Sequence, residues 1–335
     1  MHIGRSYNFF EFLFWTRRNI FWLFVLGIVS TALYQLYDFK WMAVPFTVVA
    51  VLGTATAFII GFRNQQTYRR AWEAKQVWGA TMNASRSWAF MCRDFLHDEA
   101  KARELIYRHF AWITVLRYQL RSMRTWENIS KPYNKEYKKY YSIPEMETSL
   151  EKELLKYLSA DEINRVLSAQ NKATILIAMQ GNTLKKLHEE GSIDEFMFLN
   201  MHSALRGLSD HQGRSERIKN FPYPRQYATI NSLFMKLFCL LLPFSLLKEF
   251  DMLNDGVTGF LQGKMVWLVI PFSVLISWVF TSLEQVGEST ENPFEGSAND
   301  VPISQMARNI EIDIREMLGE EELPSLLEPK NNIIL

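Results

Sequence analysis

The sequence lacks most of the features by which an enzyme or a disulfide-rich protein is recognised. Only two of its 335 residues are cysteine, Cys92 and Cys239, so neither a disulfide framework nor a zinc-finger spacing is present. There is no glycine-rich phosphate loop, no HExxH zinc motif and no nucleophile elbow, and the six histidines are scattered. We therefore expect no enzyme activity and no cofactor, and these residues give no basis for assigning a metal site.

A large charge of either sign is also missing. The formal net charge is +1 at pH 7, so no nucleic-acid partner is indicated. The N-terminal stretch MHIGRSYNFFEF contains an acid and no small-residue cleavage site after a short apolar core, so a cleaved signal peptide is not expected. Aromatic residues are abundant instead, at 14 % of the chain, and Trp and Tyr are favoured at membrane interfaces.

Four apolar runs lie toward the two ends of the chain. Three carry no charge, and the fourth is interrupted only by Lys236, which either faces a pore or reaches back to the cytoplasmic interface. At ~1.5 Å per residue the runs reach roughly 28–33 Å, close to the thickness of a bilayer core. We expect four transmembrane helices, at 19–38, 42–62, 228–248 and 265–284.

The basic residues gather on one side of these predicted spans. They precede the first span, follow the second and precede the third: Arg5, Arg17, Arg18, Arg63, Arg69, Arg70, Arg214, Arg217, Lys219 and Arg225. The two short connections between spans are poorer in basic residues. By the positive-inside rule, we expect a multi-pass protein of the inner (plasma) membrane with both termini in the cytoplasm.

The chain therefore divides into five segments of an all-α fold. These are a cytosolic or interfacial N-terminal segment, two transmembrane helices, a cytosolic helical domain, two further transmembrane helices, and a cytosolic acidic loop with a helix and tail: 1–18, 19–62, 63–225, 226–284 and 285–335. Apolar residues of the middle segment recur at helical spacing, and no alternating strand pattern occurs.

Two stretches predict where helices of the middle segment run and stop. FIIGFRNQQTYRRAWEAKQVWG, residues 58–79, starts apolar and acquires three arginines, yet nothing in it breaks a helix. We expect one continuous helix that couples its membrane end to its cytosolic end. SKPYNKEYKKYYSIPEM contains Pro132 and Pro144 and is predicted to be a loop.

The second span carries polar and aromatic residues at a regular interval. Thr54, Phe58 and Phe62 are spaced by four, and four residues advance a helix by ~400°, so the three side chains share one face with a drift of ~40° per step. This face either packs against other helices or lipid, or lines a narrow apolar constriction that gates a pore by dewetting.

An acidic stretch, ENPFEGSANDVP at 291–302, follows the fourth span. Its oxygen-bearing residues indicate either a cation site or a clasp on the soluble domain. Alternatively, the stretch is only a polar turn after the helix, which Pro293 ends. The spacing does not fit an EF-hand loop, which needs glycine at its sixth position and glutamate at its twelfth.

Taken together, these motifs resemble the bacterial branch of the bestrophin family of ion channels. The residues that carry the resemblance are IIGFRNQQTYRRAWEAKQVWG, NASRSW, SERIKNFPYPRQY, LFCLLLPFSL and ENPFEGSANDVP, which occur in the right order and at the right distance from the spans. The resemblance covers about residues 5 to 315 and is poor in detail from about 125 to 190. It implies a homopentamer around one central pore.

The resemblance also implies two constrictions. The second span of each subunit would line an apolar neck with Thr54, Phe58 and Phe62, although members usually carry three bulky apolar rings there and Thr54 departs from that pattern. A cytosolic aperture is expected on the helix before SERI, where Leu205 or Leu208 supplies it.

Animal members of the family carry a calcium clasp after the fourth span. Asn292 and Asp300 match that pattern, whereas the two other ligand positions, Ser289 and Ser297, lack carboxylates. Because loss of ligand charge weakens a calcium site, we expect weak or absent calcium binding in this degenerate clasp-like loop.

The expected function is passive conduction of small monovalent ions, chiefly chloride and other anions, through a pentameric pore gated at the neck. A cation-selective channel of the same fold is an alternative, because Glu284 and Glu288 lie near a possible vestibule. A secondary transporter, suggested by Lys236, Pro243 and Pro271, and a membrane-anchored scaffold are further alternatives.

Overall fold

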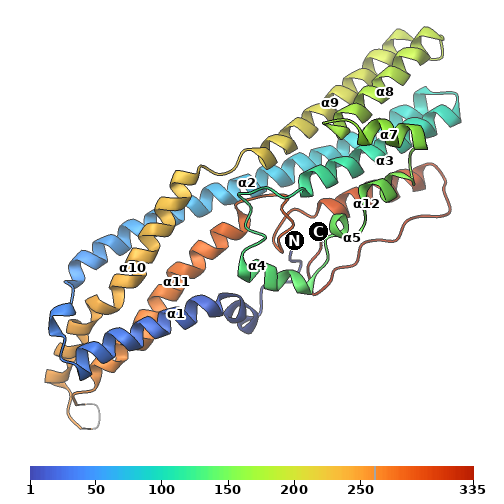
Figure 1. Cartoon of the computed structure of the whole chain (residues 1–335). Helices are drawn as coiled ribbons and strands as arrows, with labels where there is room; N and C mark the ends of the chain where they lie inside the picture. The colour runs from blue at the N-terminus through green and yellow to red at the C-terminus, as the bar shows by residue number, and fades with distance from the viewer. Residues whose placement is uncertain (260–261) are drawn as a thin grey trace. The chain divides into compact units, whose positions relative to one another are not determined.

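A computed structural model describes residues 1–259 and 262–335, which contain helices, turns and isolated bridges but no strand (Figure 1). The described residues form two compact units. We call Arg5–Arg69 with Tyr223–Glu291 the membrane unit, and Met1–Gly4 with Arg70–Pro222 and Asn292–Leu335 the polar unit. The five-segment division remains a prediction.

The membrane unit is built from long apolar helices. They are α1 (Phe9–Leu36), the first part of α2 (Phe46–Phe95), α10 (Arg225–Met252) and α11 (Val269–Thr290), with short 3₁₀ turns η1 (Lys40–Met42), η3 (Leu253–Gly256) and η4 (Met265–Leu268). All four predicted spans are confirmed as parts of helical segments long and apolar enough to cross a membrane.

The bounds of these helices differ from the predicted spans. Helix α1 begins at Phe9 rather than at 19, because the Asn8 side chain accepts a hydrogen bond from the Phe10 N–H and caps the helix there. Residues 9–18 are therefore helical. Helix α2 begins at Phe46 rather than at 42, after a 3₁₀ turn. Hydropathy locates the apolar stretch, whereas capping decides where the backbone becomes helical.

Helix α2 is one unbroken element of 50 residues, about 75 Å long at ~1.5 Å per residue (Figure 1). The predicted continuity of 58–79 is confirmed. Its second part belongs to the polar unit, where Trp78 and Trp88 are fully buried in the core. No proline interrupts α2, so its backbone hydrogen bonds continue out of the apolar stretch.

The polar unit packs helices around a single apolar core. Its remaining elements are α3 (Glu99–Arg121), α4 (Pro132–Tyr137), η2 (Lys138–Tyr140), α5 (Pro144–Glu147), α6 (Leu150–Leu154), α7 (Ala160–Leu167), α8 (Lys172–Glu189), α9 (Glu195–Asn220) and α12 (Ile303–Met317). A capping box of Ser159 and Glu162 starts α7.

The predicted loop between Pro132 and Pro144 is wrong in part. Helix α4 and turn η2 occupy 132–140, and each proline sits in the first turn of a helix. Proline lacks the N–H that is unpaired in that turn, and its fixed φ suits the helix, so here it starts a helix instead of ending one.

The two ends of the chain meet in the polar unit (Figure 1). The Ile3 N–H donates to the Asn332 carbonyl at 2.8 Å, and the Ile334 N–H donates to the Met1 carbonyl at 3.1 Å. Ile333 to Leu335 are buried, although most of the tail before them is exposed. The tail is therefore anchored by its last apolar residues.

Candidate pore face and acidic loop

One face of α2 in the membrane unit is exposed. Phe58 is 66 % exposed and Phe62 is 52 % exposed, and Thr54 is exposed on the same face. Thr56 and Ile60, on the opposite face, are buried against the rest of the unit. Thr54, Phe58 and Phe62 thus lie on one face, as predicted, and the rest of the chain covers this face only in part.

The two phenylalanine rings pack against each other. Their centroids lie 4.5 Å apart with planes at 87°, an edge-to-face arrangement that aromatic quadrupoles favour. The Thr54 hydroxyl donates to the Ala50 carbonyl at 3.0 Å, one turn back along α2. Its proton is therefore used within the helix, so Thr54 makes this face less polar than its residue type suggests.

Small residues flank the aromatic pair. Ala55, Ala57 and Gly61 are exposed, and a Cβ placed on Gly61 would meet no atom within 4 Å. Their directions fall within an arc of about 160° centred near Phe58, at ~100° per residue. Small side chains allow transmembrane helices to approach closely, so this face is suited to packing near other helices.

The candidate aperture residues lie elsewhere. Leu205 is 3 % exposed and Leu208 is fully buried, and both belong to the core of the polar unit. Neither side chain is exposed in this chain, as a side chain lining an aperture would be. With Met201 and Gln212 they form the buried stripe of α9, a spacing of four, three and four that is typical of a core-facing helix.

Asp300 organises the acidic loop that follows α11. Its Oδ1 accepts the N–H groups of Phe294 and Val301, both at 2.7 Å, and its Oδ2 accepts the Gly296 N–H at 2.6 Å. The Arg121 guanidinium lies 2.6 Å from the same Oδ2. One buried carboxylate thereby closes the loop on itself and fixes it to α3.

The loop backbone needs this support. Phe294 has a φ of +71°, a left-handed conformation that is unusual for a bulky residue, and its ring is fully buried beside Trp78. Gly296 has a φ of +88°, and a Cβ there would lie 2.8 Å from the Ile143 side chain. The loop can take this path only because other contacts hold it.

Glu145 extends the network from α5. Its carboxylate pairs with Arg117 at 2.7 Å and accepts a hydrogen bond from the Ser304 hydroxyl at 2.6 Å. Arg121 lies 3.6 Å from the same carboxylate. Burial alone would raise the pKa of Glu145, but Arg117 and Arg121 more than offset burial and hold it below its ordinary value of 4.5.

A second buried carboxylate in the loop is held differently. Burial raises the pKa of Glu295 to about 8, opposed by the Asn128 N–H, which donates to its Oε2 at 2.9 Å. The charges of Asp300 and Glu127 add to the rise, and Lys219 opposes it. Glu295 is therefore mostly protonated at neutral pH, which lowers the negative charge of the loop.

The Asp300 carboxylate, one of the clasp-like positions, is already occupied by protein groups. Asp300 already accepts three N–H groups and a guanidinium, so a metal ion would have to displace a cation that is part of the protein. The Ser289 hydroxyl donates to the Val286 carbonyl within α11, and the Asn292 Nδ2 donates to the Trp126 carbonyl, whereas the buried Asn292 Oδ1 accepts no hydrogen bond from the described residues.

Sequence reasoning missed Arg121 and Glu145. Asp300 lies 179 residues from Arg121 along the chain, and no local pattern links them. The only available signal was the number of acidic residues in the loop, because buried carboxylates are normally paired with cationic side chains.

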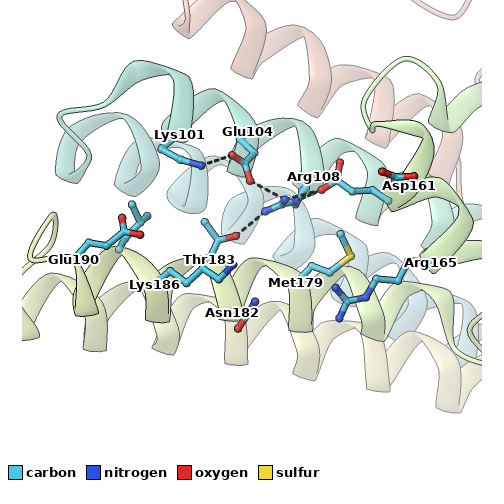
Figure 2. Close-up of a pocket in the computed structure, with 12 residues that line it drawn as sticks. Lys101, Glu104, Arg108, Asp161, Arg165, Met179, Asn182, Thr183, Lys186 and Glu190 are labelled. Carbon is cyan, nitrogen blue, oxygen red and sulfur yellow. Dashed lines mark hydrogen bonds and ion pairs between the residues drawn. The ribbon is translucent and has the colours of Figure 1, made fainter.

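The polar unit also holds a charged pocket of about 310 Å³ between α3, α7 and α8 (Figure 2). At its floor, Arg108 contacts Glu162, Glu104 and Thr183, each at 2.7 Å. The charged lining consists of four acids and four bases: Glu104, Asp161, Glu162, Glu190, Lys101, Arg108, Arg165 and Lys186. We assign this balanced set a structural role, because it ties three helices together and favours neither sign of ligand.

The fold and the exposed face of α2 define a helical membrane protein that crosses the bilayer several times. Its second span exposes the aromatic residues Phe58 and Phe62. A family model described as Bacterial/Fungal Bestrophin protein matches residues 16–316, and the chain belongs to this family. The predicted resemblance is thereby confirmed. The matched region includes α2 and the acidic loop, so both candidate regions lie within the family match.

Similar proteins support the same assignment. The voltage-dependent anion channel-forming protein YneE of Escherichia coli (strain K12) is 29 % identical over 290 residues, which cover 87 % of this chain and 81 % of that protein. The Salmonella typhi protein of the same name is 28 % identical over 305 residues, 91 % of this chain and 86 % of that protein. These relatives are named as channels, not as enzymes.

A bacterial bestrophin homologue from Klebsiella pneumoniae shares the fold. Its crystal structure superposes with a TM-score of 0.75 at 25 % sequence identity, over 90 % of this chain and 98 % of that chain. The all-helical prediction with four long apolar helices is thus supported by sequence, structure and structural similarity.

Proposed function

We propose that this chain forms a homopentameric channel that conducts small monovalent anions, including chloride, passively across the inner membrane, with both termini in the cytoplasm. The observation that carries the proposal is the exposed face of α2, where Phe58 and Phe62 are uncovered in a protein of this family. The names of the relatives support an anion as the conducted ion.

The proposed neck consists of five copies of Thr54, Phe58 and Phe62 around the pore axis. Rings of phenylalanine exclude hydrated ions until the constriction widens, so the barrier to conduction is partly one of dewetting. Aromatic edges are slightly positive and faces slightly negative, so edges turned toward the axis favour anions. The small residues beside Phe58 permit the close approach of α2 helices that such a neck requires.

Conduction in this proposal does not require calcium. The acidic loop is held by Arg121 in place of a metal ion, and Glu295 carries little negative charge at neutral pH. Binding of calcium to this loop is accordingly weak or absent. The loop follows the last transmembrane helix, and the contacts of Asp300 hold its backbone.

The reversal potential across asymmetric salt tests the proposal. Purified protein is reconstituted in planar bilayers, and chloride and sodium are varied separately with a large impermeant counterion. The reversal potential should follow the chloride gradient. A potential that follows sodium would establish the cation-selective alternative, and absence of any current, also from the Phe58→Ala/Phe62→Ala variant, would favour a scaffold.

A further inference from the structure

A buried arginine lies directly beside the exposed aromatic face of α2. Arg63 follows Phe62 in sequence but is only 3 % exposed, because one residue along a helix turns the side chain by about 100°. Phe62 is exposed while its neighbour lies inside the membrane unit. The two side chains are therefore on one rigid helix but in opposite environments.

Arg63 is held by an ion-pair network inside the membrane unit. Its Nη2 lies 2.7 Å from the Oε2 of Glu291, and its Nη1 lies 3.6 Å from the Oε1 of Glu284. Glu291 also contacts Arg225 at 2.9 Å. Both glutamates are nearly fully buried. The network has two positive and two negative charges and joins α2, the start of α10 and the end of α11.

Polar contacts beside Arg63 also join α2 to α11. The Asn64 amide donates to the Leu283 carbonyl at 3.0 Å, and the Thr67 and Thr290 hydroxyls lie 3.2 Å apart. Gly287 makes room for Asn64, whose amide oxygen would clash with any Cβ at that position. These contacts fix both the rotation and the height of α2 against α11.

The geometry makes the network sensitive to rotation of α2. A rotation of about 20° moves a side-chain end lying ~6 Å from the helix axis by roughly 2 Å. Such a displacement separates the Arg63 guanidinium from Glu291 beyond hydrogen-bonding distance. A rotation of this size, which turns Phe58 and Phe62 away from their present direction, therefore breaks this ion pair.

We propose that Arg63 is a positioning residue of the channel, and that its pairing with Glu291 and Glu284 holds α2 in the rotation at which Phe58 and Phe62 close the neck. This inference rests on the proposed channel function. Release of the pair frees α2 to rotate and the neck to widen. Arg63 itself does not touch the conducted ion.

The test combines a cysteine at the neck with a double-mutant cycle. Phe58→Cys is modified with a water-soluble thiol reagent in reconstituted protein, and the rate is compared in Arg63→Met, Glu291→Gln and the double variant. Cys92 and Cys239 are buried, and the parent without Phe58→Cys gives the background. Thermal unfolding midpoints and open probabilities are measured on the same set without the added cysteine.

The labelling rate and open probability should respond differently from the unfolding midpoint. Arg63→Met should raise the labelling rate and the open probability by about tenfold, within the range of coupling between contacting charged groups. The double variant should label no faster than Arg63→Met, because the same pair is already broken. Its unfolding midpoint should nevertheless lie above that of Arg63→Met, because one buried carboxylate, that of Glu284, is then left without Arg63 instead of two.

Two controls complete the design. Arg69→Met removes an exposed arginine from the same helix and should change neither labelling nor gating. Leu184→Ala lowers the stability of the polar-unit core and should lower the unfolding midpoint without faster labelling.

Three outcomes would overturn the positioning role. The first is unchanged labelling in Arg63→Met, and the second is a labelling rate that recovers together with the unfolding midpoint in the double variant. The third is a double variant whose increase in labelling rate is the product of the increases in the two single variants. Labelling needs no current, so a protein that conducts nothing would refute the channel while the cycle still decides the role of Arg63.

Discussion

Replacing Asp300 by asparagine removes the charge at the centre of the acidic loop and changes little else in size. In the native loop both carboxylate oxygens accept two donors each, three of them backbone N–H groups and one the Arg121 guanidinium. An amide has one oxygen and one NH₂ group. Whichever way it turns, the NH₂ group faces two donors and leaves them unpaired.

The cost follows from these contacts. Removing one partner of a buried ion pair typically costs about 3–5 kcal/mol. Here Arg121 loses its carboxylate partner at 2.6 Å and keeps only Glu145, at 3.6 Å. If the amide turns its NH₂ group toward Phe294, this left-handed residue loses the bond that holds its N–H, and such strain costs roughly 1–3 kcal/mol when it is unsupported. We expect Asp300→Asn to lower the free energy of unfolding by about 3–5 kcal/mol and the midpoint by roughly 5–10 °C.

Thermal unfolding of the purified protein in detergent measures this effect, with calcium and with a chelator. The loss should be the same in both conditions, because a guanidinium and not a metal ion neutralises Asp300. Asp313→Asn is the matched control, since its pair with Arg86 is partly exposed and worth less than about 1 kcal/mol. A wild-type midpoint that rises with calcium, or a loss in Asp300→Asn no larger than in the control, would refute the reasoning.

Four further predictions concern the neck, the loop, pH and the core. Phe58→Ala with Phe62→Ala should raise the open probability strongly in single-channel recordings, because the dewetted constriction is removed; unchanged gating would contradict the neck. Chelation of calcium should leave the current intact, and loss of current would show that the loop does bind the metal. Glu145→Gln should reduce the fall of stability below about pH 4.5, because the pKa of this carboxyl is lower in the folded than in the unfolded protein and wild type loses that stability as pH falls. Unfolding midpoints of both proteins from pH 3 to 7 measure this, and parallel curves would contradict it. Leu208→Ala should lower the free energy of unfolding by about 2–5 kcal/mol and leave the reversal potential unchanged, since the side chain lies in a core. A shifted reversal potential would indicate that Leu208 lines the pore.

The fold was predictable because its signals are local and long. Four apolar runs predicted four helices that the structure contains, and the absence of a helix breaker in 58–79 predicted the continuity of α2. Helix ends were predicted less well, since a single cap at Asn8 or a proline at position 132 outweighs the average composition of a segment.

The candidate site was predictable only where it depends on one helix. A spacing of four placed Phe58 and Phe62 on a common face, and the structure leaves that face exposed. The same kind of periodicity on α9 did not distinguish a core-facing stripe from a pore-lining one, and Leu205 and Leu208 belong to the core. Periodicity shows which residues share a face, but not what lies opposite that face.

The sequence by itself determined the class of protein, the number of long apolar helices and the family, because these depend on composition, run length and motif order. Tertiary structure alone decided which charges meet. Arg63 pairs with Glu291 across 228 residues, and Arg121 pairs with Asp300 across 179 residues. Such pairs form only after distant segments pack together, and burial then makes an unpaired charge costly, so no local pattern of the chain contains them.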